Sequence, residues 1–450
     1  MRRSTTSCRR ILAAVFGLSL ALGAEMREAQ ADDGPSQVAL SRGAEQNSEV
    51  APSNEDRLFE LWLTRGRELT SLRTKVGAAE FDVATAALWP NPSLTVSGSY
   101  LLSGENMNGA KGIGPQLTFP LPVFGQIGMR KSEAVANLRM VEVEVLAEVW
   151  DRAGDVQDAM LERAFSEAEV QQIQANLTEL ARIARVVSTR ASAGANSVYD
   201  TLRVSTAEAT FRAGLATAET GRDRAEAKLL SLLAVPGLSH APITREGLLG
   251  FDGPEGEPAL QALARRRRPD LELARRGILA AQASAARYRR EVAPIPSVSV
   301  GPYFTQGPAS VYLQGSISVP LPAFDRNQGL IGRALMQAEG QQALVDATAQ
   351  RVQIEVHGAW QARERAREAL AAFQEGGLKA TDELLARAEV SYQAGTFAIL
   401  DLLDAYRAVW DARAQALQLE RAFAQAEVEL EHAAVLLPIN NRARGALPPR

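Results

Sequence analysis

From residue 402 to residue 437, apolar side chains recur every three or four positions without a break. This spacing gives an α-helix one apolar face. Because the pattern holds over about five heptads, it predicts a left-handed coiled-coil seam, and its alanines permit close approach of a second helix. The seam positions are Leu402, Ala405, Val409, Ala412, Ala416, Leu419, Phe423, Ala426, Leu430, Ala433 and Leu437.

Two further segments, 128–193 and 378–392, keep the same spacing and predict long helices. A helix of roughly 65 residues would extend about 100 Å at a rise of 1.5 Å per residue. Gly194 and Gly395 stand where these outgoing helices should stop, and each is expected to cap its helix in the left-handed conformation.

Four short segments alternate apolar and polar residues instead, which predicts strands with one apolar and one polar face. In the last of them, Val311, Leu313 and Ile317 alternate with Tyr312 and Gln314. A Pro-Leu-Pro sequence follows each pair of strands and is expected to end the hairpin, because proline cannot continue a ladder. The predicted strands are 94–103, 112–119, 297–305 and 310–319, paired as β-hairpins 94–119 and 297–319.

Three islands of sequence occur twice, in the same order and about 200 residues apart. A period so long is too large for a solenoid and implies two copies of one structural unit. The matched islands are Asn91–Val96 with Ile295–Val300, Phe119–Phe124 with Val319–Phe324, and Ala193, Gly194 and Asp200 with Ala394, Gly395 and Asp401.

Each copy consists of a helix, a hairpin and a long helical pair that turns at Gly194 or Gly395. Clustered prolines and glycines between the copies predict a connector. The predicted parts are a signal peptide 1–31, flexible tails 32–54 and 439–450, a first repeat 55–234 with its turn near 194–197, a connector 235–257, and a second repeat 258–438 with its turn near 395–398.

The N-terminus has the pattern of a secretion signal. Basic residues precede the apolar run Ile11–Ala24, and Ala29–Ala31 offers a small-x-small cleavage pattern. The run is shorter than the roughly 20 residues that span a bilayer. The single cysteine, Cys8, precedes the run and would be removed, so the exported chain is expected to lack disulfides and thiolate sites.

Composition narrows the chemistry. Hydrophobic residues make up 46% and charged residues 23%, as in folded proteins, and 49 basic residues face 53 acidic ones. The sequence contains no glycine-rich phosphate loop and no nucleophile elbow, so we predict neither an enzyme nor a bound cofactor.

Three polar clusters are interpreted as structural. The run Arg265–Arg268 has no stacking aromatics and predicts a solvated helix start rather than a nucleic-acid site. Glu429 and His432 have Glu-x-x-His spacing without a second such pair, so no metal site is predicted. Asp325–Asn327 are expected to fix a strand-to-helix turn rather than to contact cargo.

The parts together predict a tunnel. Four amphipathic strands cannot close a barrel, which needs about eight. Lipid does not tolerate the unpaired edges of an open sheet, so several copies must share one barrel. A barrel continued by long helices is a conduit.

The sequence resembles the TolC-like outer-membrane efflux factors over nearly the whole exported chain. The resemblance is carried by Trp89–Pro92, Arg268–Asp270, both Pro-Leu-Pro ends and the two Ala-Gly…Asp turns. The segment Pro320–Gly329 is most like the branch that serves heavy-metal pumps of the cobalt–zinc–cadmium type.

The resemblance implies a mainly α fold with a small β part, in the outer membrane of a Gram-negative bacterium. It implies a homotrimer with a shared twelve-stranded transmembrane β-barrel in lipid and an α-helical periplasmic barrel. It also implies docking to a periplasmic adaptor and to an inner-membrane RND-type pump driven by protons. A drug-efflux or type I secretion conduit would share this fold. A periplasmic coiled-coil adaptor would show similar helices, but it has no reason to carry duplicated amphipathic hairpins.

The resemblance also implies a periplasmic gate. Asp401 and Asp404 would point into the tunnel as rings of three, and Asp200 would pair with Tyr392. An alternative stays open in which these acids only stabilise the start of their helices, because the helix dipole favours acidic residues in a first turn. Phe397 replaces the basic residue that the family usually has two positions after the glycine. The turns expected to dock the adaptor contain Gly194, Ala195, Asn196, Gly395, Thr396 and Phe397.

Overall fold

The computed structural model describes residues 54–100, 102, 111–192, 198–243, 245, 253–254, 256–305 and 311–436. The predicted signal peptide, the two predicted tails except residue 54, and the first predicted turn at 194–197 lie outside these residues.

The described chain forms two compact units. One contains the residues up to Ser71, Glu148–Arg268 and those from Gln350 onward; the other contains Leu72–Ala147 and Pro269–Ala349. Each unit combines segments from both predicted repeats. Compact packing and sequence duplication therefore divide the chain differently.

The first helical segment of each predicted repeat is two helices rather than one. Helices α2 (Asn54–Arg65) and α3 (Arg67–Ala86) break at Gly66, where an added Cβ would lie 2.6 Å from the carbonyl oxygen of Trp62. Helices α7 (Glu257–Arg267) and α8 (Pro269–Glu291) break at residue 268. The residue before a proline disfavours helical torsion angles, which explains the second break.

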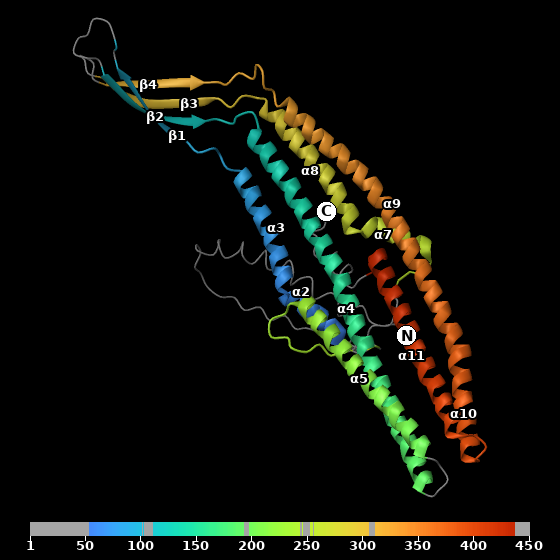
Figure 1. Ribbon diagram of the computed structural model, residues 1–450. Helices are drawn as coiled ribbons and strands as arrows, with labels where there is room; N and C mark the ends of the chain where they lie inside the picture. Colours follow the sequence, from blue (N-terminus) through green and yellow to red (C-terminus); the bar gives the residue numbers. More distant parts are fainter. Residues whose placement is uncertain are drawn as a thin grey trace, which may run out of the picture. The chain divides into compact units, whose positions relative to one another are not determined.

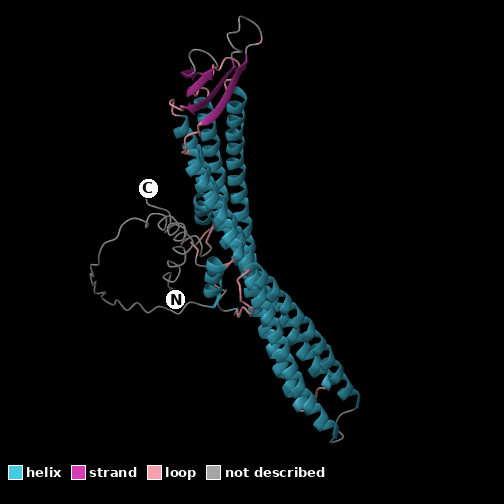
Figure 2. Cartoon of the chain, turned by 90° about the vertical axis from the view of Figure 1, so that its left-hand side faces the viewer, coloured by secondary structure: helices cyan, strands magenta, loops and turns pink. Residues whose placement is uncertain are grey.

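Four strands form one antiparallel sheet in the order β1-β2-β3-β4. Figure 2 draws the strands in magenta. They are β1 (Ser93–Tyr100), β2 (Lys111–Pro120), β3 (Ser297–Thr305) and β4 (Val311–Ser318), close to the segments that the alternation predicts. The two predicted hairpins are joined through β2 and β3, which pair from Gly112 with Thr305 to Pro120 with Ser297. The sheet therefore combines both repeats, and β1 and β4 lie at its edges.

Directly paired residues project to the same face of the sheet, so the register defines two faces of different chemistry. On the polar face, the described strands carry hydroxyl, amide and glycine positions and no charged side chain. The apolar face presents Leu94, Val96, Ile113, Leu117, Phe119, Val298, Val300, Phe304, Val311, Leu313 and Ile317, with Tyr100 and Lys111 paired at the end of the strands. The polar face presents Ser93, Thr95, Ser97, Ser99, Gln116, Thr118, Ser297, Ser299, Tyr303, Tyr312, Gln314, Ser316 and Ser318.

The two chain segments that leave the sheet begin their helices in the same way. The side-chain Oε1 of Gln126 accepts a hydrogen bond from the N–H of Phe124 at 3.0 Å. The Oε1 of Gln328 accepts one from the N–H of Arg326 at 2.7 Å. In both repeats a glutamine thus closes the turn on its own backbone.

A residue with positive φ precedes each of these glutamines. Gly125 has φ 82° and Asn327 has φ 56°, and glycine and asparagine are the residues that tolerate this conformation best. Asp325 Oδ1 accepts a hydrogen bond from the N–H of Asn327 at 2.9 Å, and Asn327 Nδ2 donates to the carbonyl oxygen of Tyr288 at 3.0 Å. These contacts confirm that this segment fixes the strand-to-helix turn.

The long helices differ between the repeats (Figure 1). The first repeat has α4 (Gln126–Ser192), a single helix of 67 residues, and α5 (Val198–Leu233). The second has α9 (Gln328–Ala372), a π-helical turn η2 (Phe373–Leu378), α10 (Lys379–Gln393) and α11 (Ile399–Ala434). Among the described helices, none has an apolar stretch long enough to cross a membrane.

The predicted seam along α11 is confirmed by burial. Leu419 and Phe423 are half-buried, and Leu437 lies outside the described residues. The remaining seam positions are buried, namely Leu402, Ala405, Val409, Ala412, Ala416, Ala426, Leu430 and Ala433.

Arg268 corrects the prediction of a solvated basic run. Its side chain is only 5% exposed, its Nη2 donates to Glu355 at 2.7 Å, and its guanidinium lies 4.6 Å from the ring centre of Trp150. Arg265 and Arg266 are exposed, as predicted, but they lie in the last turn of α7, so the prediction of a helix start was wrong. The run ends in a buried residue because Pro269 starts a new helix there, which turns the fourth arginine toward the core of its unit.

Candidate functional site

The turn between α10 and α11 contains the left-handed glycine cap that the sequence predicts. Gly395 has φ 79°, and its N–H donates to the carbonyl oxygen of Tyr392 at 3.1 Å. The N–H of Thr396 donates to the carbonyl oxygen of Ser391 at 3.0 Å. This pair of bonds is the Schellman motif, which satisfies the last carbonyl groups of a helix. Phe397 follows the cap and is exposed.

Asp401 and Asp404 lie in the first two turns of α11, and both are exposed. Asp401 Oδ2 accepts a hydrogen bond from the N–H of Ala398 at 2.9 Å, so this carboxylate caps its own helix. Asp404 Oδ1 is 3.9 Å from the guanidinium of Arg407 on the next turn. A role of either carboxylate in a gate stays a prediction.

Tyr392 is buried, whereas Asp200 lies half-buried in the first turn of α5. The Asp200–Tyr392 pair stays a prediction, and Gly194, Ala195 and Asn196 lie outside the described residues. Tyr392 belongs to an apolar cluster that joins α4, α5, α10 and α11 and contains Leu180, Ile183, Val187, Val204, Ala207, Ala388, Tyr392, Ile399, Leu402, Leu403, Ala405, Tyr406 and Trp410.

A polar network that the sequence did not predict lies on this cluster. Arg182 of α4 donates from Nη2 to Glu389 Oε1 of α10 at 2.9 Å and to the hydroxyl of Tyr406 of α11 at 2.5 Å. The Tyr406 hydroxyl in turn donates to Glu389 Oε1. One helix of the first repeat is thereby tied to both helices that flank the Gly395 turn.

The charges in this network stabilise one another. The hydrogen bond from Tyr406 lowers the pKa of Glu389, burial opposes this, and the bond from Arg182 lowers it further, with a net shift below the ordinary value. Burial raises the pKa of Tyr406, and the Glu389 carboxylate raises it again. Near neutral pH the network therefore consists of a charged arginine, a charged glutamate and a neutral tyrosine.

An aromatic pair extends the network by one helical turn. The Trp410 ring meets Phe211 of α5 edge-on, with ring centres 4.6 Å apart, and lies 5.6 Å from the Tyr406 ring. Its Nε1–H donates to Glu179 Oε2 of α4 at 3.2 Å, which satisfies the buried indole. The sequence signal for this site was Tyr406 and Trp410 on one face of an alanine-rich seam.

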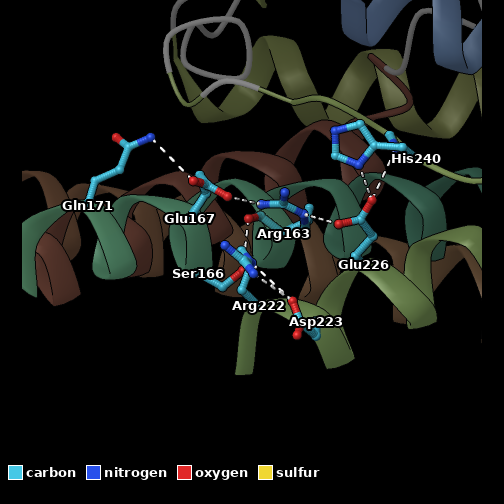
Figure 3. Close-up of polar contacts among 9 residues, drawn as sticks. Arg163, Ser166, Glu167, Gln171, Arg222, Asp223, Glu226 and His240 are labelled. Carbon is cyan, nitrogen blue, oxygen red and sulfur yellow. Dashed lines mark hydrogen bonds and ion pairs between the residues drawn. The ribbon is translucent and has the colours of Figure 1, made fainter. Parts of the chain in front are cut away.

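A second polar cluster holds the start of the connector against α4 and α5 (Figure 3). The largely buried Arg163 pairs with Glu167 at 3.0 Å and with Glu226 at 3.4 Å. Glu226 Oε1 also accepts the N–H of Ala241 at 3.3 Å and contacts His240. Burial raises the pKa of Glu226, but the bonds from His240 and Ala241, together with Arg163, give a net lowering. The cluster lines an open hollow of about 490 Å³ and anchors the connector.

His432, the histidine of the Glu-x-x-His pair, packs against an aromatic ring, and the absence of a metal site stays a prediction. His432 stacks on Trp150, with ring centres 3.9 Å apart, and an added Cβ at Gly154 would lie 2.7 Å from the histidine ring. Within the residues that the structure describes, no three His, Cys, Asp or Glu side chains group as metal ligands.

Comparisons with known proteins agree with this architecture. The model of the outer membrane efflux protein family matches residues 58–235 and 260–434. The cobalt-zinc-cadmium resistance protein CzcC of Cupriavidus metallidurans is 24% identical over 408 residues, which cover 88% of this chain and 93% of CzcC. The solved structure of CusC has a TM-score of 0.69 at 21% identity and covers 89% of this chain and 96% of its own. The open-state channel MtrE of Neisseria gonorrhoeae has a TM-score of 0.69 at 19% identity, with 85% and 88% covered.

The chain belongs to the outer membrane efflux protein family. It has the TolC-like fold, long helices with a small four-stranded sheet, and it is an outer-membrane channel component of an efflux system. The family consists of efflux conduits rather than enzymes.

Proposed function

We propose that three copies of this chain form one passive conduit for heavy-metal cations. The observation that carries the proposal is the two-faced sheet with β1 and β4 at its edges. Four strands are too few to close a barrel, and a bilayer does not tolerate open edges. Pairing of β4 with β1 of the next copy removes the edges, and the duplicated repeats 55–234 and 258–438 supply the helices of the tunnel.

The apolar face of the sheet is expected to contact outer-membrane lipid. An arginine near the bilayer midplane on a lipid face costs about 2–4 kcal/mol, and much less on the lumen side. Leu313→Arg and Ile317→Arg should therefore impair membrane insertion, whereas Gln314→Arg and Ser316→Arg on the same strand should not. Equal insertion of both pairs, measured by outer-membrane fractionation, would refute the assignment of faces.

Divalent heavy-metal cations are the proposed cargo. The relative CzcC is a cobalt-zinc-cadmium resistance protein, and Pro320–Gly329 carries the resemblance to that branch. A periplasmic adaptor and an inner-membrane RND-type pump are the proposed partners, and the pump supplies the energy.

Gene deletion tests the cargo directly. Tolerance to zinc, cobalt, cadmium, nickel and copper should fall, while tolerance to a drug panel should not change. The plasmid-borne chain should restore tolerance, and Leu313→Arg should not. Loss of drug tolerance alone would identify a drug-efflux conduit, and loss of a secreted protein would identify a type I secretion conduit.

The proposed gate lies at the Gly395 turn. Exposure of Asp401 and Asp404 near this turn supports rings of carboxylates that attract cations. Replacing both by Asn should lower cation selectivity in planar bilayers, whereas Asp411→Asn, farther along α11, should not. Asp200→Ala with Tyr392→Phe should raise conductance. Unchanged selectivity and conductance in intact trimers would leave these residues as helix-capping acids.

Both predicted turns, 194–197 and 395–398, are the proposed docking surface for the adaptor. Cysteines placed at Ala195 or Thr396 should crosslink to a co-expressed adaptor, whereas a cysteine at the exposed Gln415 should not. Failure at both turns in an assembly that still exports metal would refute docking there.

A further inference from the structure

Tyr303 lies flat across the polar face of the sheet. Its ring covers Gly112 and Gly114 of the neighbouring strand β2. An added Cβ at Gly112 would lie 2.7 Å from the ring carbon Cε1, and one at Gly114 would lie 3.1 Å from Cε2. The Cβ at Gly114 would lie still closer to Cδ2 than to Cε2, and real Cβ atoms do not approach a ring as closely as at these two positions, so both glycines are needed for the ring to lie in this place.

The far end of the ring is held by a hydrogen bond. The Tyr303 hydroxyl is bonded to Ser99 Oγ of β1, so the phenol spans β2 completely. Strands β1 and β2 beneath the ring are also joined by a side chain, because Ser97 Oγ donates to the carbonyl oxygen of Gly114 at 3.1 Å. The ring therefore has a built slot: two glycines as its floor and a serine at its end.

The ring has little freedom to move sideways. Tyr303 is paired directly with Tyr312 of β4, so a second ring stands on the opposite side. Side chains at directly paired positions have Cβ atoms roughly 5 Å apart. A side chain pushed out of the slot must therefore rise from the sheet into the space that the polar face borders.

We propose that the Gly112–Gly114 slot keeps Tyr303 against the wall of the conduit and thereby sets the bore near its outer end. The inference rests on the proposed function, in which the polar face lines the lumen and each residue occurs three times. The position is close to the end of the strands that is remote from the helices, since Gly112 pairs with Ser99 and with Thr305. The position of the Tyr303 ring thus determines the width that is available to a passing solute.

Single-channel recording of the purified trimer in planar bilayers tests the slot. Gly112→Ala should lower conductance by roughly a third and reduce the size of the largest permeant polyethylene glycol, since three displaced rings narrow one lumen. Tyr303→Ala should raise conductance. In Gly112→Ala with Tyr303→Ala, conductance should return to the value of Tyr303→Ala alone, because no ring is left to displace.

Two glycines of the same sheet serve as controls. Gly98 and Gly315 project to the apolar face, and an added Cβ would meet its nearest atom at 3.7 and 3.8 Å. Gly98→Ala and Gly315→Ala should leave conductance unchanged. A conductance drop in Gly112→Ala that persists when Tyr303 is Ala would overturn the slot, as would unchanged conductance in Gly112→Ala.

The outcome separates this inference from the proposed function. Absence of any pore, or of trimers on native gels, in the unmodified chain would contradict the conduit itself. A normal pore in the unmodified chain with no response to Gly112→Ala, Gly114→Ala or Tyr303→Ala would leave the conduit standing and refute the slot alone.

Discussion

The two helices that leave the sheet have the same start and different bodies. Gln126 and Gln328 close their turns by the same backbone hydrogen bond. Beyond that start, α4 runs as one helix to Ser192, whereas the second repeat inserts the π-helical turn η2 between α9 and α10. A duplicated sequence has kept its apolar spacing and its turn chemistry while its helix geometry diverged.

The divergence also separates the two ends of the polar network. The cation of the polar network, Arg182, comes from the unbroken α4, and its anion, Glu389, comes from α10, which follows the π-helical turn. The π-helical turn is a common feature of functional segments in helices. We infer that the two copies have taken different parts in holding the Gly395 turn.

Truncating a leucine should give the largest difference in stability between α4 and α10. Leu180 of α4 is fully buried, whereas Leu385 of α10 is half-buried beside the same cluster. Leu180→Ala should lower the free energy of unfolding by about 2–5 kcal/mol, because a cavity remains. Leu385→Ala should lower it clearly less. Denaturant unfolding of the protein in detergent measures both, and equal losses would contradict the difference.

Replacing Gln126 or Gln328 should give the second-largest difference in stability between the two repeats. Gln126 is fully buried, and its Nε2 also donates to the carbonyl oxygen of Ala293 at 3.2 Å. Gln126→Ala should cost about 1–3 kcal/mol because it leaves two partly buried backbone groups without this partner. Gln328 lies at a more exposed turn, so Gln328→Ala should cost less than half as much in the same unfolding assay. The reverse order would show that the shared bond, rather than burial, determines stability.

The π-helical turn provides a sharper test within the second copy. An added Cβ at Gly377 would lie 2.8 Å from the Phe373 ring, whereas one at Gly376 would meet no atom within 4 Å. Gly376→Ala should stabilise the helix by about 0.5–1 kcal/mol, and Gly377→Ala should be less stable than Gly376→Ala by about 1–2 kcal/mol. Thermal unfolding midpoints compare them, and equal midpoints would contradict the predicted clash.

Acid should loosen the network by the smallest amount. The native pKa of Glu389 is below its ordinary value of 4.5, so its contribution to stability is present above pH 4.5 and is lost as the pH falls through the lowered pKa. Hydrogen exchange in α10 and α11, corrected for intrinsic rates, should rise in that range. Tyr406→Phe removes the principal hydrogen bond and should move the midpoint up toward 4.5. An unmoved midpoint would assign the transition to another carboxylate.

The sequence predicted the elements that depend on local pattern. Period-two alternation located the strands, three-and-four spacing located the α11 seam, and a glycine at a helix end located the Gly395 cap. It did not predict the break at Gly66, because glycine inside a helical pattern does not reveal that a side chain there would lie against the carbonyl oxygen of Trp62.

The features that the sequence missed depend on how distant segments are aligned. Arg182 and Tyr406 are 224 residues apart, so their contact depends on the register between two helices. Arg268 was assigned to solvent because a run of four arginines does not show which of them faces Trp150. The register of the sheet was also required to bring Tyr303 over Gly112.

Because β1 and β4 lie at the edges of the sheet, completion of the fold depends on how often chains meet and on their concentration. In the proposed assembly, a single chain carries two rows of edge donors and acceptors that only water satisfies until another copy pairs with them. Its completion is then a collision-limited reaction whose yield follows mass action. Half the amount of protein in the periplasm should lengthen the interval in which the edges are exposed more than in proportion. During that interval, copies of the same chain and any other unpaired strand compete for the edges of β1 and β4.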